Sequence, residues 1–246
     1  MNVGYGIECG KMDFIYSYTF NYKIGRKRSN TLKLFRKSIE CASKYYKVKL
    51  ITDTSSFNKL KDFTSNVIID YPSELTYLDD FKIYALNQYP GHTIIDPDIF
   101  LFHKLNYQPG YDIYAEFNAI GNYNDFSKTL EPRIKIWKEK GFEDYFPGYF
   151  DLGVVPNIGL LFIESNEIIK KYIHIYNQVK TWVMNNVGFN LKDSRLIGEY
   201  SLGYLAKTKN YKIGFYRDMN NKYDHYAGFE KYDPWYNGAK INNSLL

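Results

Sequence analysis

The sequence has little cysteine and no long hydrophobic run. Its 246 residues include two cysteines, Cys9 and Cys41, which form neither a disulfide framework nor a zinc-binding spacing. No apolar stretch approaches the roughly 20 residues that a membrane-spanning helix needs. The N-terminal residues lack the basic and apolar regions of a signal peptide. We therefore expect a cytoplasmic protein without a transmembrane segment.

A large charge of one sign is also absent. The net charge is +5, from 32 Lys and Arg against 27 Asp and Glu. This small excess does not indicate a nucleic-acid-binding surface, so we expect no nucleic-acid partner, although it suits an anionic ligand such as a nucleotide diphosphate. Aromatic residues, in contrast, make up 19% of the chain. They suit stacking on sugars or bases, but the codon bias of an AT-rich genome explains them better.

Strand and helix patterns alternate over the first hundred residues. β-branched and aromatic runs predict four strands, at residues 13–20, 48–52, 67–69 and 93–95. Apolar residues at helical spacing predict a helix capped by Ser29 and a second helix from Glu74 to about Gln88, with a short helix near Lys59. This alternation predicts an α/β fold with a mostly parallel twisted sheet and helices on both faces.

The second half of the chain is less regular. Residues 118–150 form a long connection, of the kind that serves as a lid or a substrate loop, although an insertion without function explains it equally well. Further strands are predicted at residues 112–117, 153–163 (interrupted at 156–159) and 211–216. Helices are predicted after Pro132, at 167–187 and at 193–206.

The strand at residues 93–95 ends in Asp96-Pro97-Asp98, the only Asp-x-Asp in the sequence. Two adjacent carboxylates repel each other unless a cation lies between them, and carboxylate oxygens are what magnesium and manganese prefer. Asp and Pro are also common in turns for local reasons, so a plain turn is the alternative. The position favours a site, because ligands of parallel sheets bind beyond the carboxyl ends of strands.

Two later segments add residues that suit a diphosphate. Asn157-Ile158-Gly159 interrupts an apolar strand, and a glycine there permits close approach of a ligand. His225 precedes Gly228 and Lys231 in a segment that reads as loop. An imidazole can complete the coordination of a divalent ion, a glycine lets the backbone approach a phosphate, and a lysine supplies a positive charge.

These three motifs occur in the order found in GT-A-fold glycosyltransferases. The chain resembles the group that contains glycogenin and the bacterial lipopolysaccharide galactosyltransferases, over roughly residues 13–235. The resemblance implies a single Rossmann-like GT-A domain with a nucleotide-binding half (13–105) and an acceptor and sugar half (106–235). The sequence departs from the group in two places: Tyr232-Asp233 separates Lys231 from Pro234-Trp235, and Glu199-Tyr200 stands where Asp-Gln is common. Both departures indicate a divergent member.

The resemblance also implies a metal-dependent hexosyltransferase that uses a nucleotide-sugar, a UDP-sugar by family likeness, and a saccharide or glycoconjugate acceptor. In that group the configuration at the anomeric carbon is retained. Manganese or magnesium would be held by Asp96, Asp98 and His225. The donor would be bound by Asp96, Gly159, Gly228 and Lys231, with Tyr18 and Thr19 at the base.

Three further residues are candidates for the site, and for two of them a position without function is the alternative. Lys82 is a candidate for donor phosphate or sugar, but the helix pattern favours an exposed lysine. Glu199 and Asn157 are candidates for the catalytic side of the site, whereas Glu199 could also be a helix-surface residue. A catalytically inactive binding or structural protein with the same fold is the competing interpretation. A nucleotidyltransferase is disfavoured because no Gly-rich triphosphate loop lies near the first strand.

Overall fold

The computed structural model describes residues 13–17, 28–71, 78–120, 126–188, 190 and 193–225. Four of the candidate donor-binding residues lie outside these ranges, namely Tyr18, Thr19, Gly228 and Lys231. None of the helices in the described part of the chain is both long enough and apolar enough to cross a membrane.

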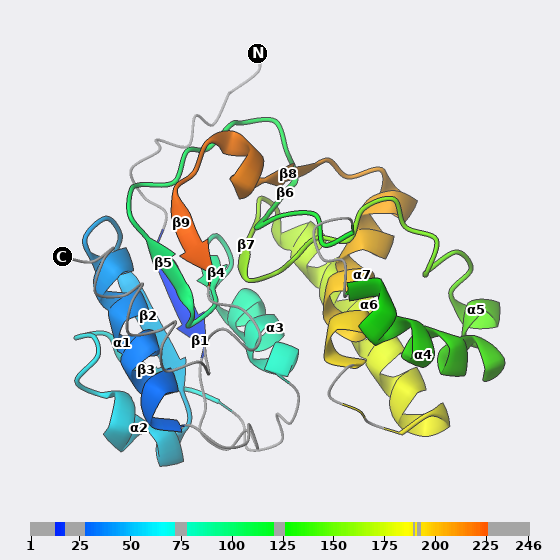
Figure 1. The fold of residues 1–246 in the computed structure, drawn as a ribbon, viewed down its shortest axis with the longest axis horizontal. Coiled ribbons are helices and arrows are strands. Elements are labelled where there is room, and N and C mark those ends of the chain that lie inside the picture. The colour runs from blue at the N-terminus through cyan, green and yellow to red at the C-terminus, as the bar shows by residue number, and fades with distance from the viewer. Residues whose placement is uncertain are drawn as a thin grey trace.

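A seven-stranded sheet forms the centre of the molecule, in the order β3-β2-β1-β4-β7-β6-β8 (Figure 1). Its strands are β1 (Phe14–Ser17), β2 (Val48–Thr52), β3 (Val67–Ile69), β4 (Thr93–Ile95), β6 (Ile113–Ala115), β7 (Leu160–Ile163) and β8 (Ile213–Phe215). Only the β4–β7 and β6–β7 pairings are antiparallel. The order β3-β2-β1-β4 matches the first four strands in the Rossmann strand order. The prediction of a Rossmann-like α/β fold with a mostly parallel sheet is confirmed.

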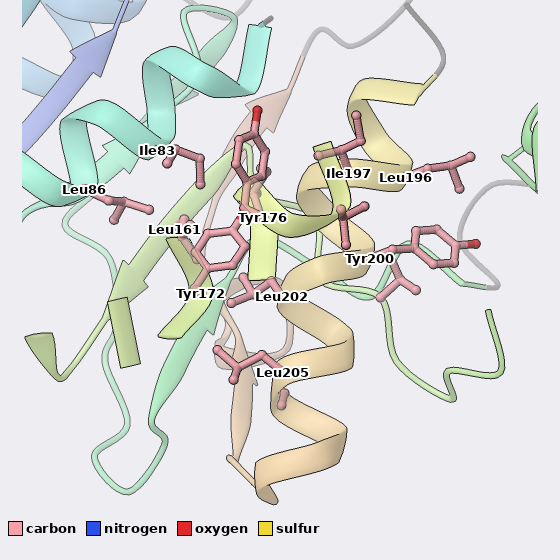
Figure 2. Packing of buried hydrophobic residues seen from close by; sticks show 14 of the residues in the cluster. Ile83, Leu86, Leu161, Tyr172, Tyr176, Leu196, Ile197, Tyr200, Leu202 and Leu205 are labelled. Atoms are coloured by element: carbon pink, nitrogen blue, oxygen red, sulfur yellow. The ribbon is translucent and has the colours of Figure 1, made fainter. Parts of the chain in front are cut away.

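Helices cover both faces of this sheet, as predicted. They are α1 (Arg28–Ser43), α2 (Thr54–Leu60), α3 (Leu78–Gln88), α4 (Phe126–Glu139), α5 (Phe142–Tyr145), α6 (Asn166–Asn186) and α7 (Asp193–Lys209). Successive side chains of a strand point to opposite faces, so Ile15 packs in one core cluster with α3, α6 and α7. Phe14 and Tyr16 pack in a second cluster with α1. Figure 2 shows the first cluster between α3, β7, α6 and α7.

Two short strands outside the main sheet bring the C-terminal part of the described chain back to the Asp-Pro-Asp turn. β5 (Ile99–Leu101) follows the Asp-Pro-Asp turn, and β9 (Tyr223–His225) pairs with it antiparallel. The predicted loop is therefore wrong for His225 itself, which is the last residue of β9. The rest of that predicted loop lies outside the described residues. A 3₁₀ helix, η1 (Tyr216–Met219), connects β8 to β9. This return brings the last described residues beside the turn that follows β4 (Figure 1).

Three other local predictions need correction. Helix α1 begins at Arg28, so Ser29 lies inside the helix and is not its cap. Helix α4 contains Pro132 and starts before it, because burial of Leu130 and Trp137 outweighs the low helix propensity of proline. Residues 153–159 form no strand. Pro156 lacks an N–H donor and makes only an isolated bridge with Asn118, although backbone hydrogen bonds from Asn157 to Phe117 and from Ala119 to Val155 hold the segment against the chain that follows β6. The Asn157 side chain then accepts the N–H of Gly159, which forms a turn before β7.

Glycine at position 203 lets the loop before Asn157 pack directly on α7. A Cβ atom at this position would lie 2.7 Å from the carbonyl oxygen of Val154. Because the nearest atom belongs to the backbone, Gly203→Ala should force the loop away from α7. We expect a loss of about 2 kcal/mol in the free energy of unfolding, measured by urea denaturation. Gly153→Ala, where a Cβ would have no neighbour within 4 Å, is the matched control, and equal losses in both variants would contradict the close contact.

Candidate functional site

The Asp96-Pro97-Asp98 turn begins where the buried strand β4 ends. The backbone N–H of Asp96 donates to the carbonyl of Gly159 at 2.7 Å, and the N–H of Ile99 donates to the carbonyl of Asp96 at 3.2 Å. Asp98 is buried, whereas the Asp96 side chain is 22% exposed. Both acids therefore lie at the carboxyl end of β4, next to the point between β1 and β4 where the strand order reverses. This is where ligands of open α/β sheets bind.

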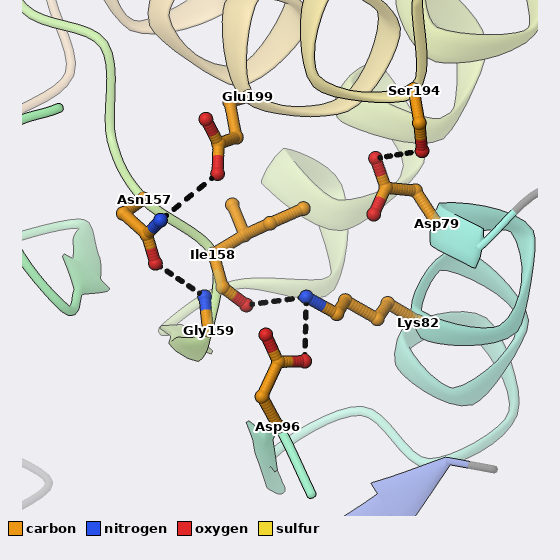
Figure 3. A network of polar contacts seen from close by, with 8 residues as sticks. All are labelled: Asp79, Lys82, Asp96, Asn157, Ile158, Gly159, Ser194 and Glu199. Carbon is orange, nitrogen blue, oxygen red and sulfur yellow. Dashed lines mark hydrogen bonds and ion pairs between the residues drawn. The ribbon is translucent and has the colours of Figure 1, made fainter. Parts of the chain in front are cut away.

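Lys82 reaches this turn from helix α3 (Figure 3). Its Nζ lies 2.7 Å from Oδ1 of Asp96 and donates to the carbonyl of Ile158 at 3.3 Å. The interpretation of Lys82 as an exposed helix lysine is wrong, since the side chain is buried. Burial acts to lower the pKa of Lys82, but the nearby carboxylates of Asp96 and Asp79 outweigh it, and the pKa is raised. The lysine is thus a charged group of the site.

Asn157 and Glu199 form a second buried polar pair beside this turn (Figure 3). The Asn157 side-chain N–H donates to Oε1 of Glu199 at 3.1 Å, and its Oδ1 accepts the N–H of Gly159 at 2.8 Å. Glu199 is 4% exposed, so the interpretation as a helix-surface residue is wrong. Its Oε2 has no hydrogen-bond partner among the residues that the structure describes. Burial raises the pKa of this carboxyl to about 7.

The backbone of Gly159 joins the Asn157–Glu199 pair to the Lys82–Asp96 pair. Its N–H is bound by Asn157, and its carbonyl accepts the N–H of Asp96. The preceding carbonyl, that of Ile158, is the acceptor for Lys82. One hydrogen bond, from Asp96 to Gly159, therefore joins the turn at residues 157–159 directly to the Asp-Pro-Asp turn, and Lys82 bridges the two turns. Lys82, Asp96, Asn157, Gly159 and Glu199, which are far apart in the sequence, form one continuous network.

The backbone of His225 lies beside the Asp-Pro-Asp turn. In the β5–β9 ladder it lies opposite Ile99, the residue directly after Asp98. The side chain of His225 is outside the described part of the structure, as are Gly228 and Lys231. Among the side chains that the structure describes, no group of three or more His, Cys, Asp or Glu residues could hold a metal ion. Asp96 and Asp98 supply two carboxylates of the kind that hard divalent cations prefer.

Two acids of this region were not singled out in the sequence. Asp79, one turn before Lys82 on α3, is buried and accepts a hydrogen bond from Ser194 at 3.0 Å. Glu116 is fully buried directly after β6, and Oε1 of Glu116 lies 3.9 Å from the Arg217 guanidinium. The spacing of Asp79 and Lys82, three residues apart, was the available signal, because such residues share one face of a helix. Glu116 carried a weaker signal, its position at a strand end.

Comparison with known proteins gave few matches. No protein-family model matches the sequence, and no curated protein sequence matches it. Among solved structures, the chain is similar to mouse xyloside xylosyltransferase 1 in its apo form, with 12% sequence identity and a TM-score of 0.46. The match covers 83% of this chain and 84% of that one. The residues of the site therefore carry the functional assignment.

Proposed function

We propose that the protein is a metal-dependent glycosyltransferase of the GT-A type. It would move a hexose from a nucleotide-sugar, a UDP-sugar, to a saccharide or glycoconjugate acceptor. The observation that supports this proposal is that the Asp-Pro-Asp turn contacts the second motif and has the backbone of His225, the first residue of the third motif, beside it. Asp96-Pro97-Asp98 contacts the Asn157–Gly159 turn by a hydrogen bond, and the strand that ends at His225 pairs beside Asp98.

Asp96 and Asp98 fit a divalent ion by their donor chemistry. Together with His225 they are the residues that would hold manganese or magnesium, which when bound neutralises the charge of a leaving diphosphate. Lys231 would add a positive charge to the same diphosphate, and Gly228 would let the backbone approach it. Lys82, buried beside Asp96, supplies a further cation on the α3 side. In the proposed site this positive charge would lie where negative charge develops on the leaving diphosphate.

Asn157 and Glu199 suit the sugar side of such a site. Oε1 of Glu199 already accepts from Asn157, whereas the buried Oε2 has no partner in the described part of the chain. A buried polar oxygen without a partner is costly, and a sugar hydroxyl would satisfy it. Retention of configuration is proposed from the likeness of the His225, Gly228 and Lys231 motif alone. Tyr18 and Thr19 are proposed for the base on the same ground.

The experiment is a screen of nucleotide-sugars with and without manganese. We expect UDP to raise the unfolding temperature only when manganese or magnesium is present. We also expect slow hydrolysis of one UDP-sugar that stops when EDTA is added. Metal-dependent UDP binding without turnover of any donor or acceptor would instead indicate a catalytically inactive binding protein. No shift with any nucleotide and any divalent ion would contradict the proposal.

A further inference from the structure

Lys82 is a buried cation that two carboxylates influence. Its ammonium contacts Asp96 at 2.7 Å. Asp79, three residues earlier on the same face of α3, acts on Lys82 through its charge and has no place in the proposed function. Asp79 is also buried, and the charges of these two acids are what raise the pKa of Lys82 against the effect of burial. Lys82 therefore has two possible ionic partners within one site.

Asp79 is fixed in place by helix α7. Ser194 donates to Oδ2 of Asp79 at 3.0 Å (Figure 3). The same oxygen lies against Gly198, where a Cβ atom would come within 2.4 Å of it. The absence of a side chain at position 198 thus makes room for this carboxylate. The contacts with Ser194 and Gly198 thus fix the position of the Asp79 carboxylate.

The contact between Lys82 and Asp96 has a consequence for any cation that binds Asp96. A divalent ion and an ammonium group on the same carboxylate repel each other, and burial weakens the screening by water. The ion therefore has to displace the ammonium from Asp96. Expelling Lys82 into solvent is not needed, because Asp79 lies one helical turn away.

We propose that Lys82 takes the place of the divalent cation beside Asp96 in the ligand-free protein, and that Asp79 is the positioning residue that keeps Lys82 in the site once a cation binds. The inference rests on the proposed function, since it takes Asp96 as a metal ligand. Once released from Asp96, the ammonium is free to pair with an anionic nucleotide. Cation and nucleotide should therefore strengthen each other's binding, and by the same factor.

The first test is calorimetric titration of the full chain with manganese alone. In Lys82→Gln the competing charge is removed, while an amide is kept to donate to the carbonyl of Ile158. We expect the affinity for manganese to rise about tenfold, because a like charge next to the ligand is lost. Lys82→Arg keeps the charge and should bind manganese as the unaltered protein does. An unchanged manganese affinity in Lys82→Gln would overturn the inference.

The second test asks whether Asp79 acts through Lys82. Asp79→Asn keeps an acceptor for Ser194 but removes the charge, so Lys82 should hold Asp96 more firmly and the manganese affinity should fall. The same substitution should have no effect in the Lys82→Gln background. Equal losses in both backgrounds would mean that Asp79 attracts the ion directly, which would overturn its positioning role.

Asp80→Asn is the matched control, and circular dichroism of each variant confirms that it folds. Asp80 is also a buried carboxylate of α3, but its partners are Tyr176 and Lys180. Its substitution should leave the manganese affinity unchanged. A loss as large as that in Asp79→Asn would overturn the positioning role, because any buried charge on α3 would then act alike.

The outcomes separate this inference from the proposed function. If the unaltered protein binds UDP with manganese but Lys82→Gln shows no gain, the inference fails and the proposed function stands. If Lys82→Gln binds manganese more tightly but no UDP-sugar is turned over, the proposed function fails and the inference stands. Manganese binding by neither protein would overturn both.

Discussion

Asp98→Asn should abolish manganese-dependent UDP binding while leaving the fold intact. The substitution keeps the size of the side chain at this buried position and removes the charge that a divalent ion needs. If a UDP-sugar is turned over, we expect its rate to fall about 10²- to 10³-fold, the usual cost of losing one such electrostatic group. Thermal shift with UDP and manganese measures binding, and single-turnover hydrolysis measures the rate.

The matched control for this substitution is Asp112→Asn. Asp112 directly precedes strand β6, at the opposite edge of the sheet from the Asp pair, and its carboxylate accepts the N–H of Lys212. Its substitution should leave UDP binding unchanged. If Asp98→Asn kept its affinity for UDP in the presence of manganese, the Asp pair would have no part in the site.

Glu199→Gln should make the protein more stable at alkaline pH and not at acidic pH. Burial raises the pKa of Glu199 from 4.5 to about 7, so the folded protein holds this proton over a range in which the unfolded chain has released it. Stability therefore falls as the pH rises through this window, and the loss is complete above pH 7. Glutamine does not ionise, and it can still accept the hydrogen bond from Asn157.

The expected gain in the free energy of unfolding is at most about 3 kcal/mol at pH 8, because one pKa unit corresponds to about 1.4 kcal/mol. It should vanish near pH 4.5. Urea denaturation across this range measures it, with Glu139→Gln, an exposed residue of α4, as the control. A smaller slope should remain in Glu199→Gln, since burial also raises the pKa of Asp79, to about 6. Identical slopes in the variant and the unaltered protein would show that Glu199 is already ionised when folded.

Strand and helix order could be predicted from the sequence because apolar spacing reports which face of an element is buried. The Asp-Pro-Asp turn was visible for the same reason, since an apolar run stops there. The burial of Lys82 was not visible. A charged residue on a helix normally indicates a solvent-facing side, and a single sequence does not show that Asp96 will neutralise it across the site.

The burial of helix α7 could not be predicted from an apolar pattern either. Almost all of its residues from Asp193 to Ala206 are buried, although many are polar or small. Its fit depends on close approach at Gly198 and Gly203 and on partners for Glu199 and Ser194, none of which produces an apolar stripe. Strand β9 escaped prediction because Tyr-Asp-His has no strand pattern of its own. Only pairing with β5 makes it a strand.

The pairing of β5 with β9 also has a consequence for biosynthesis. Ile99 and His225 face each other across this ladder, so the two strands meet only after nearly all the intervening chain has left the ribosome. Contacts between such distant segments form slowly, because a long loop must close first. During translation the nascent chain can build the β3-β2-β1-β4 part of the sheet well before β9 emerges. The candidate site should thus mature only after β9 has emerged and paired with β5.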